Sequence, residues 1–155
     1  MRLDRMILGA MAAGLVLALA LNVPRNVTAD DDDDRDRECS NATLRGPYGI
    51  NVSGIRPAGP GVTEMFAGIA VRTYDGQGAF SHLDKSKGQI TQTSPYRMST
   101  GTYDVSANCT GTAIFFPPGL PAIETSFVIV ERGKQVKEIT TGPGPAIVTA
   151  IGHKQ

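Results

Sequence analysis

The sequence predicts an all-β protein, an antiparallel up-and-down β-barrel of about eight strands, with a β-sandwich as the alternative. Residues 39–155 are rich in Gly, Thr, Val, Ile and Ser, and prolines are scattered through them. No stretch of this region repeats apolar residues at a helical period between capping residues. Short alternating runs are instead separated by tight turns, which suit a meander, and closing a meander into a barrel removes its two exposed edges.

The first three strands are predicted from alternation and from the turns between them. Residues 48–55 alternate apolar side chains with small or polar ones, as a half-buried strand does. A Pro- and Gly-rich run at 56–61 ends this strand, and 62–74 forms a long second one. Asp-Gly-Gln-Gly at 75–78 predicts a hairpin turn, because glycine readily adopts the positive φ that tight turns need. Residues 79–85 return as the third strand.

The remaining strands are shorter and are separated by glycine, proline and charged turn residues. The most apolar of them covers 123–130, and the tight turn that follows it leads directly into the next strand. In chain order, we expect strands at 89–93, 96–107, 112–116, 123–130, 135–141 and 146–151.

Alternation alone allows either face of the second strand to point into the barrel. Its odd-numbered positions are the more continuously apolar: Met65, Ala67, Ile69 and Val71. We therefore expect these side chains to face the core, and Glu64, Arg72 and Tyr74 to form a solvated stripe. In the opposite orientation, the latter three would form a polar patch in an apolar pocket, the usual layout of a small-molecule site.

Candidate chemistry is concentrated on the third strand, where Phe80, His82 and Asp84 share one face. This imidazole and carboxylate are either a general base with its orienting acid or an exposed polar pair, and alternation alone does not decide between them. No nucleophile motif and no group of spaced metal ligands accompanies them. The sequence predicts no catalytic residue, no metal site and no cofactor, and so leans away from an enzyme.

The N-terminal residues 1–29 have the pattern of a secretory signal peptide. Arg2 and Arg5 precede an apolar run of 16 residues at 6–21, which is short for a membrane span, and Val27-Thr28-Ala29 predicts cleavage before Asp30. We expect a secreted or periplasmic protein with no integral membrane segment after cleavage.

The rest of the chain consists of an acidic segment and a longer segment with a small positive net charge. Residues 30–38 hold seven acids and two arginines, a net charge of −5, and predict a disordered acidic leader. Residues 39–155 carry a net +3 without basic clusters, which gives no nucleic-acid footprint. This segment of 117 residues suits one domain with one hydrophobic core.

The chain contains two cysteines, Cys39 and Cys109. In an exported chain we expect them to form a disulfide that closes a loop of about 70 residues, worth roughly 4 kcal/mol in the chain-entropy model.

Several short motifs resemble a group of small exported bacterial β-barrel proteins of unassigned function. They are Cys39-Ser40-Asn41-Ala42-Thr43, Gly101-Thr102-Tyr103 and Cys109-Thr110-Gly111-Thr112. Gly46-Pro47-Tyr48 is also similar to the Gly-x-Trp of lipocalins and related calycins, with Tyr in place of Trp. The expected architecture also resembles a barrel of the allene-oxide-cyclase type, a comparison that rests on the arrangement of strands and on no particular residues. The resemblance implies a compact barrel and brings no particular activity with it.

Function is predicted only as a class. We expect a binding or structural module whose interior holds a small apolar molecule, because small residues on the first two strands leave space inside. Tyr48, Phe66 and Tyr103 are the candidate ligand-binding residues, with Tyr48 closing one end. The alternative is a barrel enzyme of the cyclase or isomerase type that shapes a bound substrate.

Overall fold

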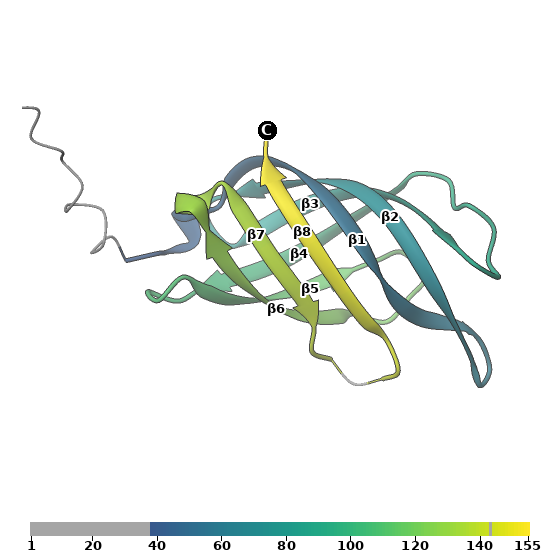
Figure 1. The fold of residues 1–155 in the computed structure, drawn as a ribbon. Helices are drawn as coiled ribbons and strands as arrows, with labels where there is room; N and C mark the ends of the chain where they lie inside the picture. Colours follow the sequence, from purple (N-terminus) through teal and green to yellow (C-terminus); the bar gives the residue numbers. More distant parts are fainter. Residues whose placement is uncertain (1–37, 143) are drawn as a thin grey trace, which may run out of the picture. The chain divides into compact units, whose positions relative to one another are not determined.

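A computed structural model describes residues 38–142 and 144–155. These residues form a closed antiparallel barrel of eight strands that follow one another in chain order (Figure 1). The predicted fold class is confirmed. The predicted signal peptide, and the acidic leader up to residue 37, lie outside the described residues. Within the described part of the chain, no helix is long and apolar enough to cross a membrane.

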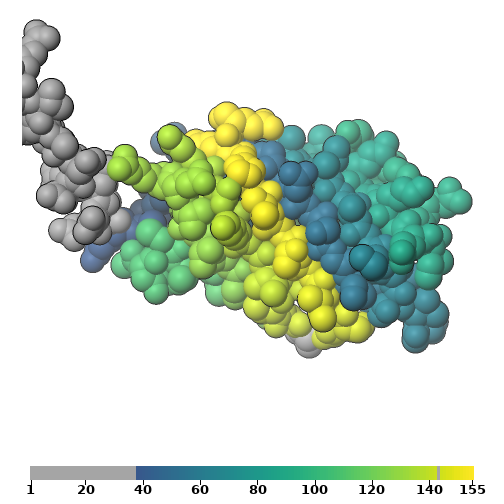
Figure 2. All heavy atoms as spheres, in the orientation of Figure 1, coloured from purple at the N-terminus to yellow at the C-terminus, as the bar shows by residue number. Residues whose placement is uncertain are grey.

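Turns and loops join the strands. One single-turn helix precedes the first strand, and a second lies between the sixth and the seventh. The elements are η1 (Asn41–Thr43), β1 (Arg45–Gly59), β2 (Val62–Asp75), β3 (Ala79–Gly88), β4 (Arg97–Val105), β5 (Thr110–Phe116), β6 (Ile123–Val130), η2 (Glu131–Gly133), β7 (Gln135–Thr140) and β8 (Ile147–Lys154). The barrel closes where β8 pairs with β1, and Figure 2 shows the two strands side by side on one face. The strand expected at 89–93 is wrong, because this segment is a loop between β3 and β4.

The predicted hairpin between β2 and β3 forms around one carboxylate. Asp75 Oδ1 accepts hydrogen bonds from the backbone N–H groups of Gln77, Gly78 and Ala79 at 2.7, 3.0 and 3.0 Å. Gly76 has a φ of 81°, a region that favours glycine. The turn therefore sets the register of β2 against β3.

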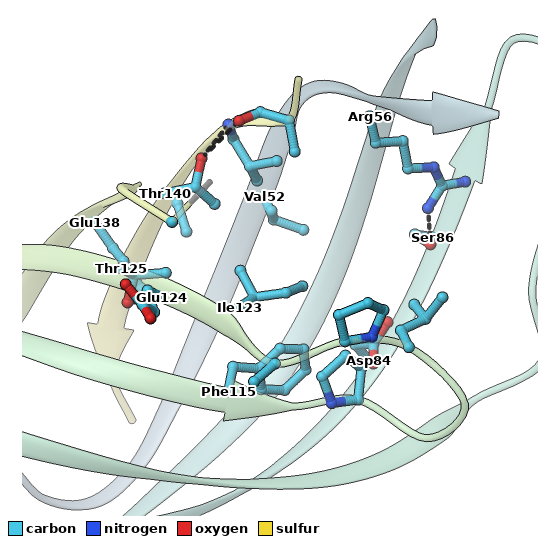
Figure 3. A pocket seen from close by; sticks show the side chains of 18 of the residues that line it. Val52, Arg56, Asp84, Ser86, Phe115, Ile123, Glu124, Thr125, Glu138 and Thr140 are labelled. Atoms are coloured by element: carbon cyan, nitrogen blue, oxygen red, sulfur yellow. Dashed lines mark hydrogen bonds between the residues drawn. The ribbon is translucent and has the colours of Figure 1, made fainter. Parts of the chain in front are cut away.

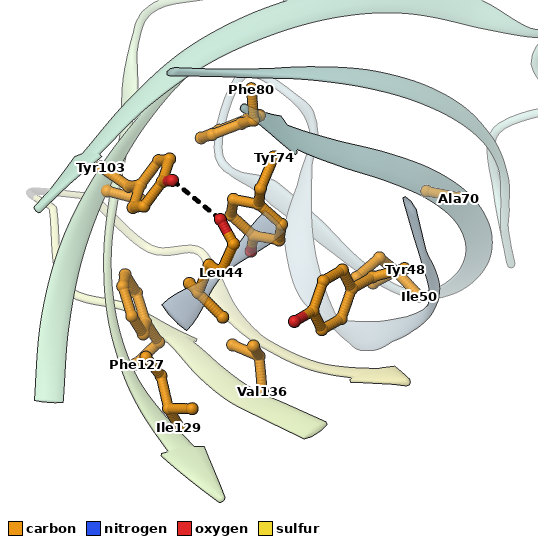
Figure 4. Close-up of a cluster of buried hydrophobic side chains, with 11 residues drawn as sticks. Leu44, Tyr48, Ile50, Ala70, Tyr74, Phe80, Tyr103, Phe127, Ile129 and Val136 are labelled. Atoms are coloured by element: carbon orange, nitrogen blue, oxygen red, sulfur yellow. Dashed lines mark hydrogen bonds between the residues drawn. The ribbon is translucent and has the colours of Figure 1, made fainter. Parts of the chain in front are cut away.

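Aromatic side chains fill one end of the barrel (Figure 4). The ring of Tyr74 lies at their centre, with edge-on contacts to Tyr48 and Tyr103 at centroid distances of 5.2 and 5.1 Å. Glycines on neighbouring strands make room for the larger rings. A Cβ at Gly101 would lie 2.0 Å from Phe80 Cζ and 2.5 Å from the backbone oxygen of Ile114, so any larger residue there would displace both. This end of the barrel is a packed core.

The segment before β1 closes the same end from outside the sheet. Leu44 is fully buried there, and the Tyr103 hydroxyl donates to the backbone oxygens of Asn41 and Leu44 at 3.0 and 3.1 Å. Cys39 and Cys109 form a disulfide with a Cα–Cα distance of 5.0 Å, which confirms the predicted pairing. The bridge ties the closing segment to the turn between β4 and β5.

The expected orientation of the second strand is wrong. Met65 and Ile69 are 61% and 54% exposed, whereas Glu64 and Arg72 are buried. The reason is Tyr74, which must point inward to form the aromatic core. Because side chains alternate along a strand, the even-numbered residues of β2 from Glu64 to Tyr74 then face the interior, whereas Val62 at the start of the strand is exposed.

Removing the disulfide tests the role of the closing segment. Replacing Cys39 and Cys109 together with serine is expected to lower the free energy of unfolding by roughly 4 kcal/mol, because the bridge restricts a loop of 70 residues in the unfolded chain. Denaturant unfolding of the oxidised protein and the double variant measures the difference. Ser106→Ala, an exposed change in the same turn, is the control. Equal stability of the bridged and unbridged proteins would contradict the expectation.

Candidate functional site

The opposite end of the barrel contains a cavity of about 370 Å³. Most of its wall is apolar. Figure 3 shows Val52, Phe115 and Ile123 in this wall, together with polar side chains such as Glu138 and Thr125. Its apolar lining includes Ile50, Val52, Phe66, Phe115, Ile123 and Val148. The loop between β5 and β6 and the loop between β7 and β8 supply the rim, with Leu120 and Ala146 among the lining residues.

A layer of polar side chains separates this cavity from the aromatic core. Arg72 Nη1 donates to Glu138 Oε2 at 2.8 Å and to the Tyr74 hydroxyl at 3.1 Å. Glu138 Oε1 accepts from Thr125 Oγ1 at 2.6 Å. Burial lowers the pKa of Arg72, but Glu138 and Tyr74 outweigh it and raise the pKa above its ordinary value. The guanidinium is therefore charged, and it is paired.

His82 completes this layer from β3. Its Nδ1 accepts a hydrogen bond from Arg72 Nε at 3.2 Å, so the neutral ring carries its proton on Nε2. Burial, and then the positive charges of Arg72 and Arg97, lower the pKa of His82 to about 3. The ring lies edge-on to Phe115 with 4.8 Å between centroids. At neutral pH the imidazole is an uncharged hydrogen-bond donor in the cavity lining.

A second ion pair lies closer to the rim. Arg97 Nη2 donates to Asp84 Oδ2 at 2.7 Å, and both residues line the cavity. Asp84 Oδ1, Arg97 Nε and Ser99 Oγ are enclosed by the protein and have no hydrogen-bond partner among the described residues. These three atoms are therefore shielded from the cavity.

Hydrogen bonds to Glu64 hold the loop after β3 against the barrel. Its carboxylate is buried and accepts hydrogen bonds from Arg56 Nε, from the Thr91 hydroxyl and from the backbone N–H groups of Ile90 and Thr91. The two bonds from Thr91 contribute most to lowering the pKa of Glu64 to about 2. Arg56 also stacks on Phe66 with 4.5 Å from its Cζ to the ring centroid. This arrangement orders one side of the rim.

The structure separates the residues that the sequence singled out for ligand binding. Phe66 lines the cavity, whereas Tyr48 and Tyr103 belong to the aromatic core at the closed end. His82 and Asp84 point inward, which settles the choice between an interior and an exposed pair. They contact different arginines, with no hydrogen bond between them among the described residues.

Sequence reasoning missed Glu138, Thr125 and Arg97. The alternation along β7 indicates the inward orientation of Glu138, because Glu138 shares a face of the strand with the apolar Val136. No local pattern indicates which arginine a carboxylate will meet, because Arg72 and Glu138 are 66 positions apart in the chain.

Within the described part of the chain, no group of three or more His, Cys, Asp or Glu side chains is placed to hold a metal ion. In the comparisons with known proteins, no family model and no curated protein matches this chain.

The buried neutral imidazole predicts a specific response to acid. His82 has a folded-state pKa of about 3, below that of an unfolded histidine, so only the unfolded chain takes up its proton as the pH falls below about 6.5. The associated stability is present above that pH and is lost below it. Between pH 7 and pH 5, the protein is expected to lose on the order of 2 kcal/mol more stability than the His82→Gln variant.

Urea unfolding at the two pH values measures this difference. Ser81→Ala, an exposed change on the same strand, is expected to follow the unmodified protein. Parallel pH profiles for the unmodified protein and His82→Gln would show that the ring is protonated in the folded state.

Proposed function

We propose that this chain is an exported binding barrel that holds a small, mostly apolar molecule in its open cavity. The observation that carries the proposal is the cavity itself, an apolar space of about 370 Å³ above a floor of buried polar groups. Binding sites for small molecules have this composition, with apolar walls for affinity and a few polar groups for orientation.

The rigidity of the floor also favours binding. Arg72, Glu138 and Thr125 hold one another by hydrogen bonds, so their positions are set before a ligand enters. A preformed site loses little side-chain entropy when it is occupied. The signal-peptide pattern at 1–29 and the disulfide between Cys39 and Cys109 support export.

A barrel enzyme of the cyclase or isomerase type is the second candidate. The observation in its favour is that His82, Asp84 and Glu138 line the same cavity. The electrostatics favour binding. A pKa of about 3 makes His82 a weak base at neutral pH, and Arg72 already occupies its unprotonated nitrogen.

A ligand screen with a cavity-filling variant tests the proposal. The full chain is expressed, and the exported protein is screened by thermal shift against fatty acids, terpenoids and aromatic probes. A ligand at 100 times its Kd is expected to stabilise the protein by about 2.7 kcal/mol. Ala150→Phe places a ring in the lumen and is expected to weaken binding at least about tenfold.

The matched control is Ile151→Phe, the same new side chain on the next, outward-facing position of β8. Its affinity for each ligand is expected to equal that of the unmodified protein. Failure of every probe to bind, or equal weakening by both variants, would contradict a ligand site in the lumen.

A further inference from the structure

Apart from Glu124, the charged side chains that line the cavity are neutralised in pairs. Arg72 pairs with Glu138, Arg97 pairs with Asp84, and Arg56 pairs with Glu64, at N–O distances of 2.8, 2.7 and 2.9 Å. An ionised ligand group placed among these pairs would lose its hydration without gaining a free counter-charge. The other lining carboxylate, Glu124, is exposed and disfavours an anion further. The cavity therefore favours a neutral ligand.

Two hydrogen-bond donors of the floor, His82 Nε2 and Arg72 Nη2, have no acceptor among the described residues. His82 is 7% exposed and uses Nδ1 to accept from Arg72, which leaves the proton on Nε2. No described residue accepts a hydrogen bond from Nε2. Its cross-strand neighbour Ser99 is not an acceptor, because Ser99 Oγ has no hydrogen-bond partner in the described part of the chain. Neither Nε2 nor Arg72 Nη2 is among the enclosed polar atoms, and both residues line the cavity.

The acceptors of the same floor, in contrast, are already used. Glu138 Oε1 and Oε2 each have a donor, from Thr125 and Arg72. Asp84 Oδ2 accepts from Arg97, and Asp84 Oδ1 is enclosed. A ligand reaching the floor thus meets N–H groups without an acceptor, His82 Nε2 among them, and carboxylate oxygens that already accept a hydrogen bond or are enclosed. Burying such an N–H beneath an apolar ligand would leave a polar group unsatisfied, which is unfavourable.

From this asymmetry we infer that the ligand is a neutral, largely apolar molecule with a carbonyl oxygen, and that this oxygen accepts a hydrogen bond from His82 Nε2. The inference rests on the proposed function and adds the chemical class of the ligand. The carbonyl group enters first and reaches the polar floor, while the apolar part contacts Phe66, Phe115 and Val148 in the wall.

Three probes with one ring system test the carbonyl preference. They are the ketone acetylnaphthalene, the hydrocarbon ethylnaphthalene and the carboxylate naphthoate, each substituted at the same ring carbon. Calorimetric titration of the exported full-length protein at pH 7 is expected to give the tightest binding for the ketone. The hydrocarbon is expected to bind about tenfold more weakly, and the carboxylate more weakly still.

Two further measurements locate the preference at His82. His82→Phe is expected to abolish the difference between ketone and hydrocarbon, whereas His153→Phe, the same change at an exposed histidine, leaves it intact. The infrared carbonyl stretch of bound acetylnaphthalene needs no variant. In the unmodified protein it is expected at lower frequency than in hexane, as for a hydrogen-bonded carbonyl.

The outcomes separate the inference from the proposed function. If ketone and hydrocarbon bind equally well, or naphthoate binds best, the carbonyl assignment is wrong although the cavity binds ligands. If none of the three probes binds, the carbonyl assignment is overturned and the proposed function is contradicted with it. An unshifted carbonyl stretch in the bound ketone also overturns the assignment.

Discussion

The buried guanidinium of Arg72 determines how the interior of this barrel is organised. A charged group that is 5% exposed is stable only when it is paired and hydrogen-bonded. Glu138 from β7, Tyr74 from β2 and His82 from β3 meet this requirement together, across the full width of the lumen. The resulting layer separates a packed aromatic end from an open end. The cavity exists because side chains fill only one half of the barrel.

The fold was predictable because its signals are local. The turn at Asp75 and the alternation of β1 can each be read from a few neighbouring residues, and the pairing of Cys39 with Cys109 follows from there being only two cysteines. The orientation of β2 was not predictable in this way. Its outward face carries an unbroken run of apolar residues from Met65 to Val71, so the continuity of the apolar pattern selects the wrong face. Only the aromatic core around Tyr74, assembled from several strands, decides it.

The candidate site was predictable only in fragments, for the same reason. Phe66, His82 and Asp84 were identified as residues of interest, but their functions depend on partners from distant strands. Arg72 decides the tautomer of His82, and Glu138 holds Arg72 in position. A ligand-binding floor with N–H donors that lack an acceptor is thus a property of the closed barrel. It arises when β7 is brought opposite β2 and β3.

The most direct test of this account is the protonation of the His82 ring, observed by nitrogen-15 NMR of the full chain. The account predicts a neutral ring with its proton on Nε2 from pH 7 to pH 5, and a change in the Nε2 signal when a carbonyl ligand binds. His153→Gln assigns the two ring systems. A proton on Nδ1, or a charged ring at pH 6, would contradict the hydrogen bond from Arg72 and with it the proposed organisation of the floor.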